Sequence, residues 1–320
     1  MPNAKRPVLL IAEPDRFAAT DLLQDLFTIR KGPFTRKQLQ RAVAEADVLW
    51  VRLGHRIDRI LLNAAPRLRS IVSPTTGLNH IDRDACAEHR VRIFCLRGEN
   101  TFLRTVTATA EHALGLALAL LRQTVPAHRA VCVGVWDRDR FIGRQASGLT
   151  LGIVGMGRLG RIICRLARPI FGRILGTDPA PAAFPPGIQR VPLRHLLSTA
   201  DVVTLHLHSS PETRHLLNAA AFRAMKPGAY LVNTSRGDVI DEKALLTALR
   251  SGRLAGAALD VLTDEHASRF NPRTHPLVRY AKTHPNLVLT PHIGGATEES
   301  LPAAERFMAE KLRRHMMRWS

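Results

Sequence analysis

A glycine-rich turn between a predicted strand and a predicted helix constrains the fold of this chain most strongly. The strand covers residues 149–155 and the helix covers residues 158–167. In that setting the first glycine permits a tight turn, the second lets the backbone approach a pyrophosphate, and the third allows the helix to pack closely on the strand. The start of the helix adds unpaired N–H groups that attract phosphate. The sequence therefore predicts a dinucleotide site formed by Gly155, Gly157, Arg158, Leu159 and Gly160.

An acidic residue at the end of the next predicted strand indicates which dinucleotide is bound. Asp178 ends the strand predicted over residues 173–178 and lies 18 residues after Gly160. A carboxylate at this place accepts hydrogen bonds from the ribose hydroxyls and repels a 2′-phosphate. Pro179 and Ala180 come next, so no adjacent arginine stands ready to receive that phosphate. We therefore expect NAD rather than NADP.

Short predicted strands alternate with predicted helices along most of the chain. Further strands are expected at 8–12, 47–52, 68–74, 91–96, 201–207, 229–235, 254–261 and 286–291. This order is typical of doubly wound parallel sheets in an α/β protein. We expect a discontinuous smaller domain of residues 1–98 and 296–320, closed by a helix over 298–315, and an inserted dinucleotide-binding domain of residues 99–295. Because ligand sites often lie between domains, the active-site cleft is expected there.

The composition argues against several classes of protein. Of 320 residues, 45% are hydrophobic and 23% are charged, as in globular domains. The formal net charge is +19, but the basic residues are scattered in runs no longer than two, which is typical of a solvated surface. Aromatic residues make up only 5%, which disfavours a base-stacking surface, so we expect no nucleic-acid partner. No apolar run is long enough to span a membrane.

The cysteines and the N-terminus indicate a cytoplasmic protein without a metal centre. Cys86, Cys95, Cys132 and Cys164 form no CxxC pair and do not stand at metal-ligand spacing from a histidine. Four such cysteines are expected to be reduced structural thiols. The first apolar run is followed at once by acidic residues, which predicts a first strand rather than a signal peptide.

Three polar segments follow predicted strands in the second half of the chain. They are NTSRGDVID (233–241), GAALDVLTDE (256–265) and TPHIGG (290–295). The carboxyl ends of the strands are where doubly wound sheets place their ligands. We therefore expect the chemistry of this protein to reside in these segments.

The ordered motifs resemble the D-isomer-specific 2-hydroxyacid dehydrogenase family, which includes phosphoglycerate dehydrogenase-like and glyoxylate/hydroxypyruvate reductase-like members. The matching segments are residues 73–82, 107–122, 151–160, 205–218, 225–245, 256–261 and 290–295, so the resemblance covers nearly the whole chain. It implies an NAD-binding Rossmann domain inserted into a smaller, flavodoxin-like substrate domain. It also implies an NAD-dependent oxidoreductase that interconverts a small anionic D-2-hydroxy acid and a 2-oxo acid.

The resemblance places the family's catalytic residues on Arg236, Glu265 and His292. Elementary chemistry agrees with these roles. A planar guanidinium can bond both the carboxylate and the neighbouring carbonyl oxygen of a 2-oxo acid. A histidine is the usual proton donor near neutral pH, and a carboxylate beside it orients the ring and favours its charged form. Glu265 is preferred to its neighbour Asp264 because it stands five residues after Asp260, as in the family.

The resemblance also implies contacts with the cofactor and the substrate. Besides the glycine-rich turn and Asp178, the implied cofactor contacts are His206, Thr234, Ser235, Asp260, His292, Gly294 and Gly295. The implied substrate contacts are Arg52, Thr75, Thr76, Gly77 and Arg236. In the loop 75–77, the glycine is expected to allow a turn, and the threonine hydroxyls are expected to cap N–H groups.

The substrate and even the enzymatic role leave alternatives open. Arg52 matches a position that contacts the phosphate in phosphoglycerate dehydrogenase-like members, so 3-phosphoglycerate is an alternative substrate. We expect no regulatory domain after the last helix, which weighs against that alternative. Thr76 stands where phosphite-oxidising relatives carry a lysine, which argues against phosphite. An NAD(H)-binding sensor or corepressor-like scaffold on the same fold is the second candidate function.

Two further features carry expectations. The predicted helix over 107–122 is apolar on more than one face, so we expect it to be buried all round, and the family implies that it forms a homodimer. The connection over 263–286 is unusually long and contains Arg269 and Arg273, so we expect a functional or mobile loop. His266 follows Glu265 where the family often has proline.

Overall fold

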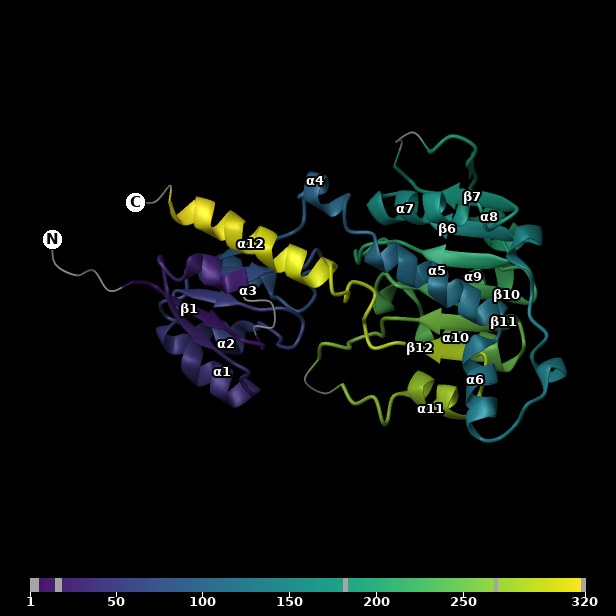
Figure 1. The fold of residues 1–320 in the computed structure, drawn as a ribbon, viewed down its shortest axis with the longest axis horizontal. Helices are drawn as coiled ribbons and strands as arrows, with labels where there is room; N and C mark the ends of the chain where they lie inside the picture. The colour runs from purple at the N-terminus through teal and green to yellow at the C-terminus, as the bar shows by residue number, and fades with distance from the viewer. Residues whose placement is uncertain (1–5, 15–18, 181–183, 268–269, 318–320) are drawn as a thin grey trace. The chain divides into compact units, whose positions relative to one another are not determined.

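The computed structural model of the chain describes residues 6–14, 19–180, 184–267 and 270–317. The chain divides into two compact units (Figure 1). The first comprises Met1–Thr105, His266–Ser268 and Thr297–Ser320, and the second comprises Val106–Glu265 and Arg269–Ala296. The first unit extends to Thr105 rather than to residue 98, because Leu103 is buried in its core and Phe102 stacks on Phe307.

The first unit contains a five-stranded, fully parallel sheet. Its strands are β1 (Val8–Ile11), β2 (Thr28–Lys31), β3 (Val48–Trp50), β4 (Ser70–Ser73) and β5 (Arg92–Cys95). Their order, β2-β1-β3-β4-β5, is the flavodoxin-like order that the family resemblance implies. The sequence did not reveal β2, because it is an edge strand in which only Ile29 is even partly buried.

Helices cover both faces of this sheet. One hydrophobic cluster contains residues of α1 (Arg36–Ala42), α2 (Arg59–Asn63) and α3 (Arg83–Glu88). The other contains residues of α12 (Ser300–Met316), the short α4 (Asn100–Leu103) and the 3₁₀ helix η1 (Ala19–Leu23). The C-terminal helix α12 thus completes the core of the N-terminal segment, with Met308, Ala309 and Leu312 fully buried.

The second unit contains a seven-stranded parallel sheet. Its strands are β6 (Thr150–Val154), β7 (Arg173–Thr177), β8 (Gln189–Arg190), β9 (Val202–Leu205), β10 (Ala229–Asn233), β11 (Leu254–Leu259) and β12 (Leu287–Leu289). The order is β12-β11-β10-β9-β6-β7-β8, so the chain reverses its direction of winding between β6 and β9. That topology confirms the predicted Rossmann domain, and its reversal point is where such sheets bind ligands.

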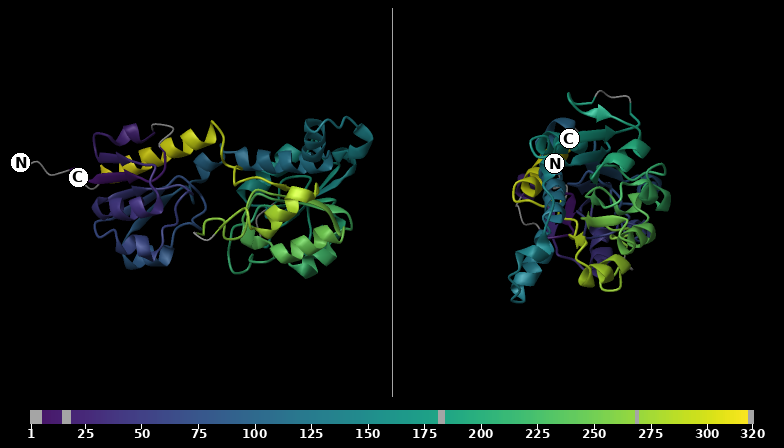
Figure 2. Two further views of the ribbon diagram at one scale, coloured as in Figure 1. Left: turned by 90° about the horizontal axis from the view of Figure 1, so that it is seen from below. Right: turned by 90° about the vertical axis from the view of Figure 1, so that its right-hand side faces the viewer.

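Two helical layers enclose the seven-stranded sheet (Figure 2). Helices α5 (Ala108–Leu121) and α7 (Arg158–Ala167) contribute to one hydrophobic cluster. Helices α8 (Leu193–Thr199), α9 (Ala219–Ala224), α10 (Glu242–Arg250) and α11 (Pro276–Thr283) contribute to the other. The expectation of one long loop over 263–286 is therefore wrong in part, because α11 interrupts it and buries Leu277 and Tyr280 in the core.

Helix α5 is not enclosed on all sides within the single chain. Ala110, Ala113 and Leu121 are fully buried, but Leu114 and Leu118 are only partly buried. The segment after it contains α6 (Thr124–Cys132) and the short 3₁₀ helices η3 (Arg138–Phe141) and η4 (Ala146–Gly148), and α6 has no buried residue. The expectation of complete burial is therefore not met in one copy of the chain.

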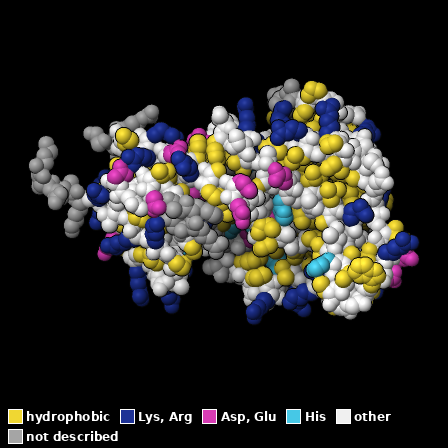
Figure 3. Space-filling model, in the orientation of Figure 1, with side chains coloured by type: hydrophobic (Ala, Val, Ile, Leu, Met, Phe, Trp, Pro, Cys, Tyr) yellow, Lys and Arg dark blue, Asp and Glu magenta, His cyan; other side chains and the backbone are white. Residues whose placement is uncertain are grey.

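The surface and the thiols agree with the composition. On the face that Figure 3 shows, Lys and Arg side chains are dispersed rather than gathered in one patch. All four cysteines are free thiols, and burial raises the pKa of Cys86 to about 11. Cys132, by contrast, is exposed. Among the described residues, no helix is both long enough and apolar enough to cross a membrane.

Candidate active site

The glycine-rich turn after β6 has a shape that suits a phosphate group. Gly155 has a φ of +94°, and a Cβ there would lie 2.5 Å from the carbonyl oxygen of His206. A Cβ on Gly160 would lie 2.0 Å from the carbonyl oxygen of Gly155. Around Gly157, no described atom lies within 4 Å of the Cβ position. The N-terminus of α7 therefore opens onto free space, where its N–H groups can bind an anion.

Arg158 and Leu159 contribute to this turn through the start of α7. The Arg158 side chain donates from Nη1 to the carbonyl oxygen of Val106 at 2.9 Å, and burial lowers the pKa of its guanidinium. Leu159 packs against the core beneath the helix. Backbone groups, rather than these two side chains, line the start of α7.

Asp178 ties the end of β7 to the glycine-rich turn. Its Oδ2 accepts a hydrogen bond from the N–H of Met156 at 2.7 Å, and its Oδ1 accepts one from Ala180 at 2.8 Å. Arg190 donates to the carbonyl oxygens of Asp178 and Ala180 at 2.9 and 3.0 Å. Arg190 could not be found from the sequence, because it stands 12 residues after Asp178 and comes close to it through the pairing of β7 with β8.

Two buried polar atoms beyond the ends of β9 and β10 lack a partner among the described residues. They are Nδ1 of His206 and Oγ1 of Thr234. Nε2 of His206 lies 3.0 Å from Oγ1 of Thr204, and burial lowers the pKa of His206 to about 4, so its ring is neutral at pH 7. An unpaired buried polar atom is costly. These atoms, with the open space at Gly157, therefore fit a bound dinucleotide.

The turn after β10 presents Arg236. Oδ1 of Asn233 accepts hydrogen bonds from the N–H and the hydroxyl of Ser235 at 2.9 and 2.7 Å, and its Nδ2 donates to the carbonyl oxygen of Arg236 at 2.8 Å. Ser235 is buried, whereas Arg236 is only partly buried. A Cβ on Gly237, at the start of the 3₁₀ helix η5 (Gly237–Val239), would lie 2.1 Å from the carbonyl carbon of Leu262. The backbone carrying Arg236 is thus packed directly against the segment that leads to Glu265.

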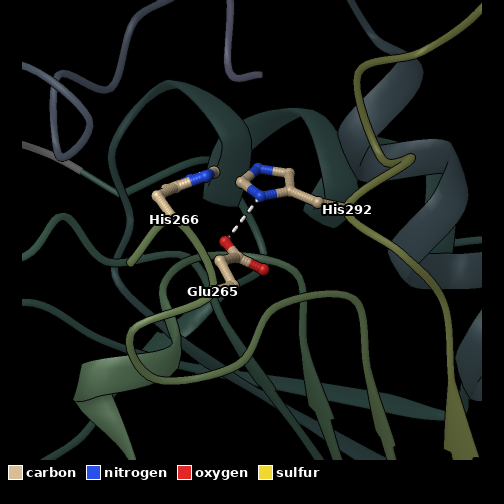
Figure 4. A group of neighbouring side chains, drawn as sticks. All are labelled: Glu265, His266 and His292. Carbon is tan, nitrogen blue, oxygen red and sulfur yellow. Dashed lines mark hydrogen bonds and ion pairs between the residues drawn. The ribbon is translucent and has the colours of Figure 1, made fainter. Parts of the chain in front are cut away.

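Glu265 and His292 form a hydrogen-bonded pair (Figure 4). Nδ1 of His292 lies 2.6 Å from Oε1 of Glu265, and the two side chains are 24% and 17% exposed. The N–H of Leu262 donates to the other oxygen, Oε2, at 3.3 Å. The carboxylate that reaches His292 is that of Glu265, while Asp264 beside it has a left-handed backbone with φ +57°. The structure therefore brings together two of the three predicted catalytic residues through a direct contact.

The loop that carries His292 is held by Asp260. This side chain is 1% exposed, and its Oδ1 accepts hydrogen bonds from the hydroxyl of Thr290 at 2.6 Å and the N–H of Ile293 at 2.8 Å. Its Oδ2 accepts from the N–H of Gly294 at 2.8 Å. Burial alone raises the pKa of Asp260, but hydrogen bonds from His112, Thr290 and the two N–H groups outweigh it and hold that pKa below its ordinary value. The carboxylate is therefore ionised and occupied by the loop.

His292 has a strained backbone that this anchoring stabilises. Its φ is +54°, a left-handed conformation that a histidine seldom adopts. Its N–H donates to the carbonyl oxygens of Asp260 and Thr290 at 2.8 and 3.0 Å. A Cβ on Gly294, two residues further on, would lie 2.9 Å from Oδ2 of Asp260, so a side chain there would push against the carboxylate that holds the loop. Next to it, Gly295 has more room, with Oγ1 of Thr109 at 3.8 Å from its Cβ position.

His112 is a contributor that the sequence analysis missed. It lies on α5, and its Nε2 is 3.0 Å from Oγ1 of Thr290 and 3.3 Å from Oδ1 of Asp260. The available signal in the sequence was a histidine on a largely apolar helix, which does not by itself indicate contact with residues 178 positions away.

The predicted substrate loop of the first unit follows β4. The hydroxyl of Thr75 donates to the carbonyl oxygen of Gly77 at 2.8 Å, and Oγ of Ser73 lies 2.9 Å from Oγ1 of Thr75 and 3.3 Å from Nε2 of the buried His80. The expectation that threonine hydroxyls cap N–H groups here is wrong for Thr75, because its hydroxyl closes the turn on a carbonyl. Thr76 is exposed.

Arg52, the other predicted substrate contact, is engaged in contacts within the first unit. Its Nη1 lies 2.9 Å from Oε1 of the buried Glu305, and its Nη2 donates to the carbonyl oxygen of Pro14 at 2.8 Å. Its side chain is 21% exposed.

Comparison with known proteins agrees with this geometry. Residues 114–294 match the model of the D-isomer specific 2-hydroxyacid dehydrogenase, NAD binding domain. The D-3-phosphoglycerate dehydrogenases of Mycobacterium leprae and Methanocaldococcus jannaschii are 35% and 33% identical over 96% of this chain. This chain belongs to the D-isomer-specific 2-hydroxyacid dehydrogenase family. It spans about half the length of these curated relatives, covering 56% and 57% of them.

Solved structures of similar length show the same fold. The TT0316 protein of Thermus thermophilus is 34% identical with a TM-score of 0.82, and each chain covers 97% of the other. The pyruvate reductase of Chlamydomonas reinhardtii is 27% identical with a TM-score of 0.81. The match covers 98% of this chain and 97% of the reductase chain. The second unit is therefore the NAD-binding domain of the family, and the predicted cofactor is confirmed at that level.

The contacts of Asp260 predict a pH-dependent loss of stability in Asp260→Asn. In asparagine, an NH₂ group replaces one carboxylate oxygen and faces a group that donates a hydrogen bond to that oxygen in the wild type. The free energy of unfolding should therefore fall by about 2–3 kcal/mol at neutral pH. Because the folded pKa is lowered, the wild-type advantage is complete above the unfolded value of about 3.9 and is lost as pH falls through the folded value. Urea unfolding of both proteins, from neutral pH into acid, measures this, with Asp264→Asn as the control. A difference that stays constant on acidification would contradict the account.

Proposed function

We propose that this chain is an NAD-dependent dehydrogenase that interconverts a D-2-hydroxy acid and a 2-oxo acid. The observation that carries the proposal is the contact between Glu265 and His292, at the ends of the strands that follow the dinucleotide turn in the same sheet. The family membership and the NAD-binding domain support it. NADH, when bound, supplies a hydride to the carbonyl carbon of the 2-oxo acid.

The chain's own residues bind the substrate and move the proton. Arg236 binds the carboxylate and polarises the carbonyl oxygen through its planar guanidinium. Because a carboxylate can only accept a hydrogen bond, Nδ1 of His292 carries the proton shared with Glu265, and Nε2 is the nitrogen that gives a proton to the carbonyl oxygen. Glu265 thereby fixes the orientation and the tautomer of the ring.

The cofactor and substrate contacts complete the proposal. Gly155, Gly157 and Gly160, with the start of α7, hold the pyrophosphate, and Asp178 bonds the ribose. His206, Thr234 and Ser235 line the neighbouring strand ends, and the loop of Gly294 and Gly295 closes the site. In the first unit, Thr75, Thr76 and Gly77 hold the substrate carboxylate through the backbone. Asp260 is only 1% exposed and both its oxygens hold the His292 loop, so we assign Asp260 to positioning rather than to a direct cofactor contact. Asp178 accepts one hydrogen bond on each oxygen but is only partly buried, so its remaining lone pairs are open to the ribose.

A panel of 2-oxo acids tests the function directly. NADH oxidation with at least one of them supports the dehydrogenase. Tight NADH binding without turnover of any acid would instead favour the sensor or scaffold. The names of the curated relatives make a phosphorylated substrate the main alternative within the enzyme class.

We expect His292→Ala and Arg236→Ala to impair catalysis in different ways. Loss of the proton donor should lower kcat by about 10²–10⁴-fold while NADH binding persists. Loss of the guanidinium should also raise KM, because the carboxylate loses its charge-assisted partner in the ground state. Steady-state kinetics and NADH fluorescence titration separate the two effects. A His292→Ala enzyme with near wild-type kcat would rule out the assigned proton donor.

The neighbouring acidic residues provide a matched pair of variants. Glu265→Gln should lower kcat by about ten- to a hundredfold with little change in KM, because the imidazolium loses its ionic partner. Asp264→Asn should retain activity, since asparagine also tolerates the left-handed backbone found at that position. If the losses were reversed, Asp264 would be the residue that orients His292.

We also propose a homodimer that forms through α5 and the segment that follows it. Large apolar side chains are exposed there: Val131 at 47%, Val133 at 78%, Trp136 at 89% and Ile142 at 76%. Several exposed apolar side chains in one segment are typical of an association surface. Helix α5, which has partly buried apolar residues, directly precedes this segment in the sequence.

A charge in this segment should disrupt the dimer. Trp136→Asp places a carboxylate in the proposed interface, so light scattering at micromolar concentration should show the mass of one chain instead of two. Ile60→Asp is the control, because Ile60 is 64% exposed but belongs to the first unit. A monomeric wild-type protein, or a dimer unaffected by Trp136→Asp, would refute this interface.

A further inference from the structure

A compact cluster of charged groups lies at the carboxyl end of β3 in the first unit. The N–H of Val51 donates to the carbonyl oxygen of Val72 on β4 at 2.9 Å, which places Arg52 beside the start of the loop 75–77. Ligands of parallel α/β sheets bind at this edge. An arginine here would by itself offer an anion site next to the loop 75–77, which we propose holds the substrate carboxylate.

The backbone part of that anion site is filled by the chain itself. The N–H of Arg52 lies 3.0 and 3.1 Å from the two carboxylate oxygens of Glu13, and the N–H of Gly54 lies 3.0 Å from Oε1 of the same residue. Neighbouring N–H groups in a turn form a concavity that binds anions such as phosphate. At Gly54 even a Cβ would come within 3.2 Å of this carboxylate, so the Glu13 side chain fits closely into the turn.

The guanidinium part is filled as well. Oε1 of Glu305 on α12 lies 2.9 Å from Nη1 of Arg52, and Glu305 is only 3% exposed. The other terminal nitrogen of Arg52 donates to the carbonyl oxygen of Pro14 at 2.8 Å. An incoming anion would have to displace this buried carboxylate from the guanidinium, and breaking a buried ion pair is costly.

The charges of this cluster disfavour a second anion. Glu13 and Glu305 bring two carboxylates to the donors of Arg52, and a second anion would have to approach both of them closely. A phosphate ester would add about 1.5–2 negative charges at pH 7 and would compete for the same N–H groups. We propose that Glu13 and Glu305 fill the anion site at Arg52 and thereby restrict the enzyme to 2-oxo acids without a phosphate group. This inference rests on the proposed function and decides between its two classes of substrate.

The test compares two substrates that differ only in the phosphate. NADH-dependent reduction of 3-hydroxy-2-oxopropanoate and of its 3-phosphate is measured for the wild type, Glu13→Gln and Glu305→Gln. The wild type should have the higher kcat/KM with the unphosphorylated acid. Each glutamine variant removes a negative charge, so it should raise the relative kcat/KM of the phosphate ester about tenfold, and added salt should reduce that gain.

Two controls separate charge from loss of structure. Glu310→Gln removes an exposed carboxylate of the same helix, which pairs with Arg306, and should leave the ratio unchanged. The double variant Arg52→Leu with Glu305→Leu removes both members of the buried pair and leaves Glu13 in place, so it should still reject the phosphate ester. Thermal unfolding of each variant reports its folding.

Three results would overturn the inference. The wild type could prefer the phosphate ester, or the glutamine variants could leave the relative kcat/KM of the two substrates unchanged. The double leucine variant could also gain as much activity with the phosphate ester as Glu305→Gln. In all three cases NADH is oxidised, so the proposed function survives. Absence of NADH oxidation with every 2-oxo acid would overturn the proposed function and this inference with it.

Discussion

The anchoring of one loop by the Asp260 carboxylate is the interaction on which the candidate active site depends. Its two oxygens take a hydroxyl and two N–H groups from residues 290–294, and this holds His292 in a left-handed backbone conformation. From that backbone the ring of His292 meets Glu265 at 2.6 Å. The strain at His292 is balanced by charge-assisted hydrogen bonds beneath it, a common arrangement at functional sites.

Much of the fold could be predicted from the sequence, because local signals and global topology agree. The glycine-rich turn, with Gly155 at φ +94°, indicates both the strand before it and the helix after it. Buried parallel strands such as Val48–Trp50 appear in the sequence as continuous apolar runs. Edge strand Thr28–Lys31 could not be found in this way, because three of its four side chains are exposed. Helix Pro276–Thr283 was missed because its buried face is short and is interrupted by polar residues.

The candidate site was predictable only as far as spacing along the chain reaches. The distance from Asp260 to Glu265 and the position of His292 before two glycines located residues that the structure brings into contact. Contacts between distant segments could not be predicted from the sequence. Glu305 and Arg52, for example, are 253 positions apart. That contact changes the meaning of Arg52, because an arginine that a sequence suggests for phosphate already has an anionic partner within its own domain.

We propose that hydride and proton are added to the same 2-oxo acid to give a D-2-hydroxy acid, as in the family to which the chain belongs. The most direct measurement uses NADH carrying deuterium in both positions at C4 of the nicotinamide and follows the product by chiral chromatography with mass spectrometry. We expect a D-2-hydroxy acid with a single deuterium on C2. A product without deuterium, a product of L configuration, or no product with any 2-oxo acid would contradict it.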